Sequence, residues 1–382
     1  MKIGILTFHF SNNYGALFQA YGLRNYLRKL GHDVEFINYQ PEYLEAGGDI
    51  NINSLFSKAT LKIIYLRVVQ LKEKFFGNKE RENYFTSFKS DFLGVNKTEI
   101  YKSKEEIEKA NLYYDLLITG SDQVWNPSEQ YGIDPVYFLE FKTSNPNVKK
   151  ISYAPSFGKA SIDKKYKNEV SKLISKLDSI SVREVSGQNI IEDLTSLKSI
   201  LVPDPTVLVS NYENVMNKYE TEEKNYIFCY YLRSRENIGE VAEYISQKEN
   251  LQIYSPHNPH RRWKEIGQTV NPGPREWLYL LNTSKFVVTN SFHGTILSIL
   301  LNKPFVVVGI GGLRAKYNER AMNILKLCGL ENRLVNEFNK SNIDDLLLEE
   351  IDWNVVNKNI KQLRQSGTDF LKSNLRLDID AK

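Results

Sequence analysis

The sequence has few cysteines, little excess charge and no long apolar run, and each scarcity excludes a class of protein. Only two cysteines occur in 382 residues, Cys229 and Cys328, and both stand in apolar runs. Two core thiols in a reducing compartment are therefore expected, and not a disulfide framework. The formal net charge of +4 is small for this length and gives no reason to expect a nucleic-acid partner. No apolar stretch approaches the roughly twenty residues of a membrane-spanning helix.

Metal-binding motifs are also scarce. The sequence has no His-Glu-x-x-His motif, no closely spaced cysteine pair and no convincing acidic cluster. Asp378-Ile-Asp380 spells an acidic pair, but it stands at the C-terminus and is interpreted as part of a frayed tail. Neither a metal nor a cofactor is expected.

What remains is the composition of an ordinary globular protein, with 41% hydrophobic and 25% charged residues. A chain of this length exceeds one ordinary core, which predicts two domains. Met1 opens directly on a strand-like run, without a charged leader or a cleavable apolar segment. A cytoplasmic protein is expected.

Strand and helix patterns alternate along the chain, as in doubly wound α/β domains. A buried strand is predicted over residues 2–8, a helix over 16–30 that ends at Gly31, and a parallel strand over 34–39. Further strands are predicted at 114–119, 150–154, 179–183 and 199–203, and a second set at 226–231, 251–254, 286–289 and 305–308. The prediction is two Rossmann-like domains facing a cleft, residues 1–212 and 213–345, followed by a closing amphipathic helix and tail over 346–382.

One polar turn between two strand-like runs is the strongest candidate site. Residues 289–295 read Thr-Asn-Ser-Phe-His-Gly-Thr and stand between a buried strand and a short apolar helix. Unpaired N–H groups at a helix start attract anions, and their field favours a neutral imidazole that can act as a base. His293 is therefore the candidate acid–base group, with Asn290, Ser291 and Thr295 as polar neighbours. The alternative is a hydroxyl-rich helix cap beside a partly buried histidine.

Two turns of the first half also carry polar groups. Thr119-Gly-Ser-Asp-Gln-Val-Trp-Asn126 follows a strand, and Asp122, Gln123 and Trp125 offer a carboxylate, an amide and an aromatic face for a sugar. Asp122 can equally be a helix cap and Trp125 a core residue. Asn13 and Tyr14 open the first helix, where they are candidates for binding acceptor or phosphate.

Several cations are candidate anion ligands. Arg183 ends an apolar strand, where it either faces a cleft or forms a salt bridge with Glu184 or a helix end. Arg314 and Arg320 follow the glycine-rich turn at 309–312, and Arg320 is the stronger candidate because a helix opens beside it. The run Tyr254-Ser-Pro-His-Asn-Pro-His-Arg-Arg-Trp263 either contributes cations to a cleft or is simply an exposed loop.

Six stretches together resemble the polysaccharide pyruvyl transferase family, whose architecture is of the glycosyltransferase-B type. They run in order through Gly4-Ile-Leu-Thr-Phe with Asn13-Tyr-Gly-Ala-Leu-Phe-Gln-Ala20, Thr119–Asn126 as quoted above, Tyr153-Ala-Pro-Ser-Phe-Gly158, Ser181-Val-Arg-Glu184 with Gly187, Asp204-Pro-Thr206, and Thr289–Thr295 with Asn302-Lys-Pro-Phe305. The resemblance covers most of residues 3–330. It implies transfer of a pyruvyl group from phosphoenolpyruvate to a sugar of a surface polysaccharide or a lipid-linked precursor, forming a ketal across two hydroxyls.

That chemistry requires an acid, a base and fixed donors for an anionic substrate, and in principle no metal. The resemblance supports His293 for acid–base work, with Asp122 as a second candidate. Many relatives carry an arginine where this chain has Ser291, so the anion must be held elsewhere. Two alternative functions remain on the same architecture, a nucleotide-sugar-dependent glycosyltransferase and a non-catalytic saccharide-binding protein.

A basic, apolar segment spans residues 58–81. Seven lysines and arginines (Lys58, Lys62, Arg67, Lys72, Lys74, Lys79 and Arg81) stand against Glu73 and Glu80, which gives a net charge of 7 − 2 = +5. Apolar residues are interleaved among them. Either the segment is a core-packed helix with a solvated basic face, or it makes weak peripheral contact with an anionic membrane.

Overall fold

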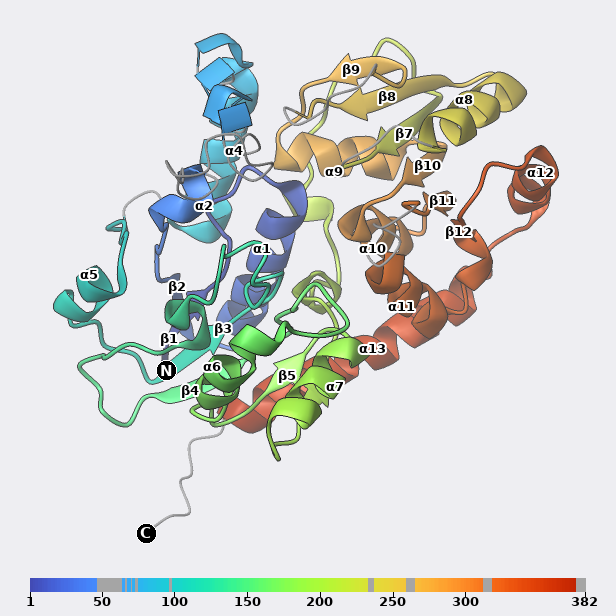
Figure 1. The fold of residues 1–382 in the computed structure, drawn as a ribbon. Coiled ribbons are helices and arrows are strands. Elements are labelled where there is room, and N and C mark those ends of the chain that lie inside the picture. The colour runs from blue at the N-terminus through green and yellow to red at the C-terminus, as the bar shows by residue number, and fades with distance from the viewer. Residues whose placement is uncertain are drawn as a thin grey trace. The chain divides into compact units, whose positions relative to one another are not determined.

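The computed structural model describes residues 1–46, 64, 65, 67–69, 71, 72, 75–95, 98–232, 237–258, 265–311 and 318–375. The chain forms two units, each with its own parallel sheet (Figure 1). The first unit contains Met1–Lys74, Lys89–Ser210 and Leu363–Lys382, and the second contains Phe75–Phe88 and Asn211–Gln362. The division after Ser210 lies two residues from the predicted boundary. Residues 75–88 belong to the second unit although they interrupt the first unit in sequence, and residues 363–382 return to the first unit. The prediction included neither feature.

The main sheet of the first unit has four parallel strands in the order β2-β1-β3-β4. Ile3 of the central strand β1 pairs with Val34 and Leu116, and all three side chains are buried, as the unbroken apolar runs require. A smaller parallel pair, β5-β6, follows in sequence. The strands are β1 (Lys2–Leu6), β2 (Asp33–Phe36), β3 (Leu116–Thr119), β4 (Lys149–Ser152), β5 (Ser181–Val182) and β6 (Ile200–Leu201).

Helix α1 begins the first βα unit at the position where the sequence predicts it. Asn13 caps the helix by accepting a hydrogen bond from Ala16 N, and Gly31 with φ +87° follows its end. Gly22 lets α1 approach the short 3₁₀ helix η4 closely. The other helices of this unit are α2 (Glu42–Ala46), the π-helical η2 (Lys89–Leu93), α5 (Lys104–Lys109), η3 (Pro135–Phe138), α6 (Lys164–Ile174), α7 (Val185–Leu194) and η4 (Pro205–Leu208), and α1 itself spans Tyr14–Lys29.

The second unit has a six-stranded parallel sheet in the order β12-β11-β10-β7-β8-β9. Val288 of β10 pairs with Cys229 of β7 and Val306 of β11, so the buried thiol of Cys229 is a core group as predicted. The strands are β7 (Tyr226–Tyr230), β8 (Gln252–Pro256), β9 (Gln268–Val270), β10 (Phe286–Thr289), β11 (Phe305–Val308) and β12 (Leu334–Val335). The helices are α4 (Lys79–Phe88), η5 (Glu213–Val215), α8 (Ile238–Glu249), α9 (Pro274–Thr283), α10 (Phe292–Leu300), α11 (Asn318–Cys328), η7 (Glu331–Arg333) and α12 (Lys340–Leu348).

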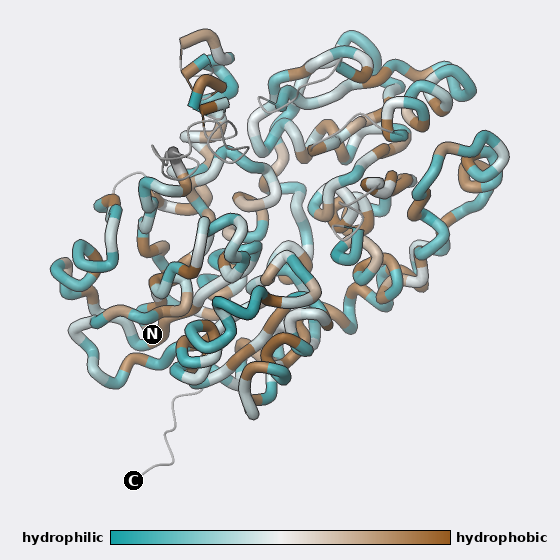
Figure 2. The backbone as a smooth tube through the Cα atoms, in the orientation of Figure 1, coloured by the Kyte–Doolittle hydropathy of each residue, from teal (hydrophilic) through white to brown (hydrophobic). Residues whose placement is uncertain are grey.

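The predicted closing helix is α13 (Trp353–Leu375), along which apolar and polar residues alternate (Figure 2). Its last part belongs to the first unit, where Arg364 donates from Nε to Val207 O at 2.6 Å and the ring of Phe370 packs on that of Tyr153. The tail from residue 376, with Asp378 and Asp380, lies outside the described residues. In the described part of the chain, no helix combines the length and apolarity needed to cross a bilayer.

The close approach of α1 to η4 predicts a strong effect of Gly22→Ala. A β-carbon at this position would stand 2.2 Å from Pro205 O, so either the helix or the turn must shift. Overpacking of this kind costs about 1–3 kcal/mol, against which the helix gains only a little from alanine. The free energy of unfolding from urea denaturation should fall accordingly.

Gly187→Ala is the matched control, because it makes the same change within helix α7. Its added β-carbon would meet Val182 Cβ at 3.2 Å, which a small side-chain adjustment accommodates. A Gly22→Ala variant as stable as Gly187→Ala would contradict the close packing of α1 on η4.

Candidate active site

The turn that carries His293 lies at the carboxyl end of β10, in the middle of the second unit's sheet. The carboxyl edge of an open parallel sheet is where ligands bind in α/β proteins. Helix α10 begins immediately after the turn, so the unpaired N–H groups of its first residues lie at the same edge.

Hydroxyl groups fix the backbone of this turn. Thr289 Oγ1 donates to Tyr230 O at 2.6 Å on the neighbouring strand β7 and accepts from Ser291 N at 3.1 Å. Ser291 is the cap of α10, and its Oγ accepts from Gly294 N. Thr295 Oγ1 donates to Ser291 O at 2.9 Å. The hydrogen bonds of Ser291 and Thr295 shape the helix start that carries His293.

Two neighbours of His293 have defined positions. Gly294 permits the tight turn, because a β-carbon there would stand 2.3 Å from Thr289 Oγ1. Asn290 Oδ1 accepts a hydrogen bond from Leu232 N at 2.9 Å and so links the ends of β10 and β7. The ring of Phe292 meets the imidazole edge-on at 5.1 Å between centroids, and His293 is 8% exposed. A buried imidazole at a helix start is positioned for proton transfer in a site that largely excludes water.

Arg320 lies in the first turn of α11, which follows the neighbouring strand β11. The helix start is fixed by Asn318, whose side chain accepts from Ile310 N and donates to Ile310 O. Helices α10 and α11 contact each other, so the half-buried guanidinium of Arg320 and the imidazole of His293 belong to adjacent helix starts on one sheet edge (Figure 1). Arg314 lies outside the described residues, as do residues 259–264 of the cationic loop.

The carboxyl edge of the first unit's sheet carries a buried polar network. Gln19 of α1 donates to Thr7 Oγ1 at 2.9 Å and accepts from Ser121 N at 3.1 Å. Ser121 Oγ donates to Ala154 O at 2.8 Å and lies 3.4 Å from Asp204 Oδ2. The ends of β1 and β3 and the start of α1 are therefore joined by side chains and not by backbone alone.

Arg183 occupies the interior of the first unit. Its Nε donates to Glu184 Oε1 at 2.9 Å and its Nη1 to Asp204 Oδ2 at 2.7 Å, and all three side chains are buried. Burial alone would lower the pKa of Arg183, but Glu184, Asp204 and Asp122 raise it well above its usual value. A guanidinium with three acidic neighbours is already neutralised. Of the two interpretations of Arg183, the structure supports the salt bridge with Glu184 and not the anion-binding role.

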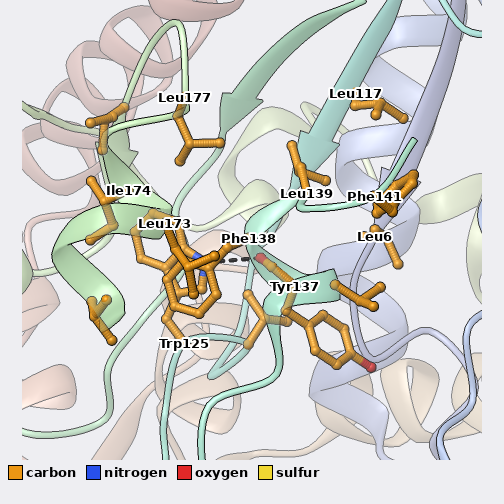
Figure 3. Close-up of a cluster of buried hydrophobic side chains, with 14 of the residues drawn as sticks. Leu6, Leu117, Trp125, Tyr137, Phe138, Leu139, Phe141, Leu173, Ile174 and Leu177 are labelled. Atoms are coloured by element: carbon orange, nitrogen blue, oxygen red, sulfur yellow. Dashed lines mark hydrogen bonds between the residues drawn. The ribbon is translucent and has the colours of Figure 1, made fainter. Parts of the chain in front are cut away.

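The polar turn at 119–126 divides into core and surface parts. Trp125 is 0% exposed, donates from Nε1 to Tyr137 O at 3.0 Å and stacks on Phe138 with ring centroids 5.1 Å apart (Figure 3). The expected sugar-stacking role of Trp125 is therefore wrong, because no face of the indole is available. Asp122, with φ +67°, and Gln123 remain half-buried, and Gln123 Oε1 accepts from Asn126.

At the start of α1, the prediction for Tyr14 is corrected, and two residues that the sequence analysis did not identify lie close by. Tyr14 is buried, so its ring does not offer a binding surface, whereas Asn13 is exposed and caps the helix. Lys89 Nζ donates to Phe10 O at 3.1 Å and to Asn12 Oδ1 at 2.9 Å, which places a cation beside this turn. Only the fold brings Lys89 here, and no local pattern indicates it.

His9 is the second missed residue, and it lies fully buried in the same turn. Its Nδ1 is 3.0 Å from Thr7 O and its Nε2 is 3.1 Å from Asn38 Oδ1. Burial lowers the pKa of His9 to about 4, against the opposing effect of these hydrogen bonds. The sequence offered one signal for this residue, because His9 directly follows the strand predicted over residues 2–8. Across the described residues, no three histidine, cysteine, aspartate or glutamate side chains are grouped so that they could hold a metal ion.

The fold is shared with solved structures of nucleotide-sugar enzymes. The UDP-N-acetylglucosamine 2-epimerase from Rickettsia bellii is 10% identical, with a TM-score of 0.53 over 97% of this chain and 95% of that one. The Methanocaldococcus jannaschii UDP-GlcNAc 2-epimerase, solved with UDP-GlcNAc and UDP, is 13% identical, with a TM-score of 0.50 over 97% of this chain and 99% of that one. These neighbours are of the glycosyltransferase-B type, which confirms the predicted α/β fold class.

The sequence itself was also compared with curated proteins and with protein families. None of the curated proteins matches the chain. The family described as polysaccharide pyruvyl transferase matches residues 13–312, which include the His293 turn and the first unit's motifs from Asn13 onward. The chain therefore belongs to the polysaccharide pyruvyl transferase family and is a transferase.

Proposed function

We propose that this transferase moves a pyruvyl group from phosphoenolpyruvate to a sugar of a surface polysaccharide, such as a capsule or exopolysaccharide, or of its lipid-linked precursor. The observation that carries the proposal is the His293 turn, where a buried imidazole, two helix starts and Arg320 share one edge of the second unit's sheet. These groups match an anionic donor whose reaction requires proton transfer.

The reaction balances without an oxidant or a cofactor. A proton adds to the methylene carbon of phosphoenolpyruvate, and one sugar hydroxyl bonds to the resulting oxocarbenium-like carbon. The carbon–phosphate oxygen bond then breaks, and a second hydroxyl of the sugar closes the ketal. The two sugar hydroxyls lose two protons. One replaces the proton that the new methyl group took up, and the other leaves on the released phosphate.

His293 and Arg320 divide this work. His293 supplies the proton to the methylene carbon and takes the proton of the attacking hydroxyl. Arg320 and the helix starts hold the phosphate and the carboxylate. On the first unit, the half-buried Asp122 and Gln123 and the exposed Asn13 are proposed to bind the acceptor.

A nucleotide-sugar reaction is the second candidate, because the M. jannaschii neighbour was solved with UDP-GlcNAc and UDP. The two reactions release different products. Incubation with phosphoenolpyruvate and a galactose- or mannose-type acceptor should release inorganic phosphate. Release of a nucleoside diphosphate from a sugar nucleotide would favour the glycosyltransferase, and inertness in both assays with retained saccharide binding would favour a non-catalytic protein.

The basic segment supports a peripheral position on an anionic membrane at its inner face. Within residues 58–81, the side chains of Ile64, Val68 and Leu71 recur at spacings of four and three, and are 39%, 58% and 54% exposed. Ile64, Val68 and Leu71 are all helical. These side chains thus form an exposed apolar stripe beside Arg67, which supports the membrane contact. Lys58, Lys62, Glu73 and Lys74 lie outside the described residues.

His293→Asn should lower kcat roughly a hundred- to ten-thousand-fold, because asparagine keeps a hydrogen bond but cannot transfer a proton. Donor affinity should fall less than turnover, and the melting temperature should change little. His32→Asn makes the same change at a half-buried histidine of the first unit and should leave kcat unaltered. A folded His293→Asn enzyme with near-normal kcat would make His293 structural and move the acid–base role to Asp122.

Arg320→Ala should raise the KM for phosphoenolpyruvate roughly thirtyfold, a loss of about 2 kcal/mol, while kcat falls less. Arg183→Ala should instead unfold at lower denaturant, since removal of one partner from a buried ion pair costs about 3–5 kcal/mol. Initial-rate kinetics and urea denaturation of both variants separate the roles. Unchanged donor kinetics in Arg320→Ala would place the anion elsewhere, and a fully stable Arg183→Ala with a raised donor KM would reverse the assignment.

The apolar stripe predicts weak, salt-sensitive binding to vesicles that contain anionic lipid, with each nearby basic residue contributing about 1 kcal/mol. Leu71→Asp should abolish co-sedimentation at low salt. Leu348→Asp removes a leucine that is also exposed, but outside the segment, and should have no effect. Equal sedimentation with neutral and anionic vesicles would rule out the membrane contact.

A further inference from the structure

A half-buried lysine lies at the carboxyl edge of the first unit's sheet. Lys89 opens the π-helical segment η2, and its Nζ donates to Phe10 O at 3.1 Å and to Asn12 Oδ1 at 2.9 Å. Both acceptors belong to the turn of residues 7–13, which connects the interior strand β1 to helix α1. The proposed reaction assigns no role to this lysine.

The protein does not neutralise the charge of Lys89. Its two acceptors are uncharged oxygens, and no carboxylate in the described part of the chain pairs with it. Burial lowers the pKa of Lys89, and no acidic neighbour opposes this effect. His9 adds no charge to the turn near pH 7, because burial lowers its pKa to about 4. A half-buried ammonium without a counter-ion is unfavourable, and a bound anion would remove that cost.

The turn also keeps hydrogen-bond donors for an anion. An ammonium group has three N–H bonds, and Lys89 uses two of them within the protein. Asn12 and Asn13 are exposed, and their amide oxygens accept from Lys89 and from Ala16 N. Among the described residues, neither amide nitrogen has an acceptor. Three donors beside one cation suit a phosphate ester, which offers three oxygens where a carboxylate offers two.

Both parts of this arrangement are fixed by the fold. Below the turn, Thr7 Oγ1 donates to Ser121 O at 3.1 Å. The segment η2 is held against α1, because Phe92 O accepts from Arg24 Nη1 at 2.9 Å. The cation and the turn are therefore in place before a ligand arrives, which lowers the entropic cost of binding.

The neighbouring strand indicates which phosphate would be bound. Strand β3 pairs with β1 and ends in the turn that carries Asp122 and Gln123, which are proposed to bind the acceptor. Adjacent strands are about 4.8 Å apart, a separation that a sugar ring can span. The hydrogen bond from Thr7 to Ser121 also joins the two turns directly. A sugar held at the β3 turn would thus place a phosphate on its first carbon within reach of Lys89.

We propose that Lys89, with the amides of Asn12 and Asn13, binds the phosphate group that joins the acceptor sugar to its carrier. This assignment rests on the proposed function for the identity of the sugar. The acceptor is then a sugar phosphate or diphosphate ester, and not a sugar within a finished polysaccharide. The pyruvyl group would accordingly be added before the sugar enters the polymer.

Calorimetric titration of the full-length protein with galactose 1-phosphate and mannose 1-phosphate, without phosphoenolpyruvate, tests the site. At least one of them should bind, and Lys89→Met should raise its Kd about tenfold or more, because methionine keeps an unbranched side chain but removes the charged donor. Lys164→Met is the matched control, since Lys164 also opens a helix of the first unit but is exposed. It should bind like the unaltered protein.

Asn12→Asp cancels the charge of the site while Lys89 stays in place. The new carboxylate would replace the amide that now lies 2.9 Å from Lys89 Nζ, and would pair with it. The melting temperature should therefore not fall, whereas the Kd of the sugar phosphate should rise about tenfold or more, since the anion would meet a neutral pair. If Lys89 only supports the turn, the variant binds normally, and that result would overturn the assignment.

Two further titrations separate the possible sources of the phosphate. Lys89→Met should leave the Kd of phosphoenolpyruvate unaltered, and an equal loss for both ligands would give the site to the donor instead. Inorganic phosphate should bind more weakly than the sugar phosphate, and equal binding would make it a site for free phosphate. Either result, or failure of both sugar phosphates to bind, would overturn the assignment.

These titrations require no pyruvyl transfer, so the site and the proposed reaction can fail separately. Sugar-phosphate binding that depends on Lys89, in a protein that transfers no pyruvyl group, would support the site and contradict the reaction. Active transfer together with an unaltered Kd in Lys89→Met would contradict the site alone.

Discussion

Parallel strands that are buried on both faces end abruptly, and buried backbone carbonyls close to those ends need hydrogen-bond donors where water is excluded. Hydroxyl side chains meet this need in both units. Thr289 donates to Tyr230 O, Thr119 to Tyr137 O and Ser152 to Ser181 O, and each hydroxyl and carbonyl lies in the interior. The polar turns that carry the candidate site are thus first a solution to a folding constraint. The candidate catalytic groups then stand on a backbone that these hydrogen bonds hold in place.

The buried charge of Arg183 follows from the same constraint. Asp204 accepts from Arg183 and, through its other oxygen, from the backbone and hydroxyl of Thr206. The Asp-Pro-Thr motif therefore fixes the 3₁₀ helix on which α1 packs, and Arg183 is the cation that makes a buried carboxylate tolerable there. The Asp-Pro-Thr motif, although it is among the stretches that resemble the family, is therefore explained by its contribution to the stability of the first unit.

The apolar runs predicted most of the sheet because a strand buried on both faces has no other composition. Strands β9 (Gln268–Val270) and β12 (Leu334–Val335), at the two edges of the second unit's sheet, escaped prediction. Periodicity also cannot tell a buried indole from an exposed one, which is why Trp125 was expected to contact sugar. The position of Lys89 beside the start of α1 depends on a fold that joins residues 77 positions apart. No window along the sequence contains that information.

Ser291 shows how one substitution can redistribute a binding role. Its hydroxyl caps α10 by accepting from Gly294 N, a bond that an arginine side chain at the same position could not supply because it has no acceptor. An arginine there would add a cation at the turn and lose this cap, whereas in the proposed reaction this chain keeps the cap and binds the anion from elsewhere. In the proposed reaction, Arg320 at the start of the contacting helix α11 supplies a cation at the same sheet edge without disturbing the turn. Ser291 thus stabilises the helix start that carries His293, and in the proposed reaction the binding of phosphoenolpyruvate depends on a second helix, α11.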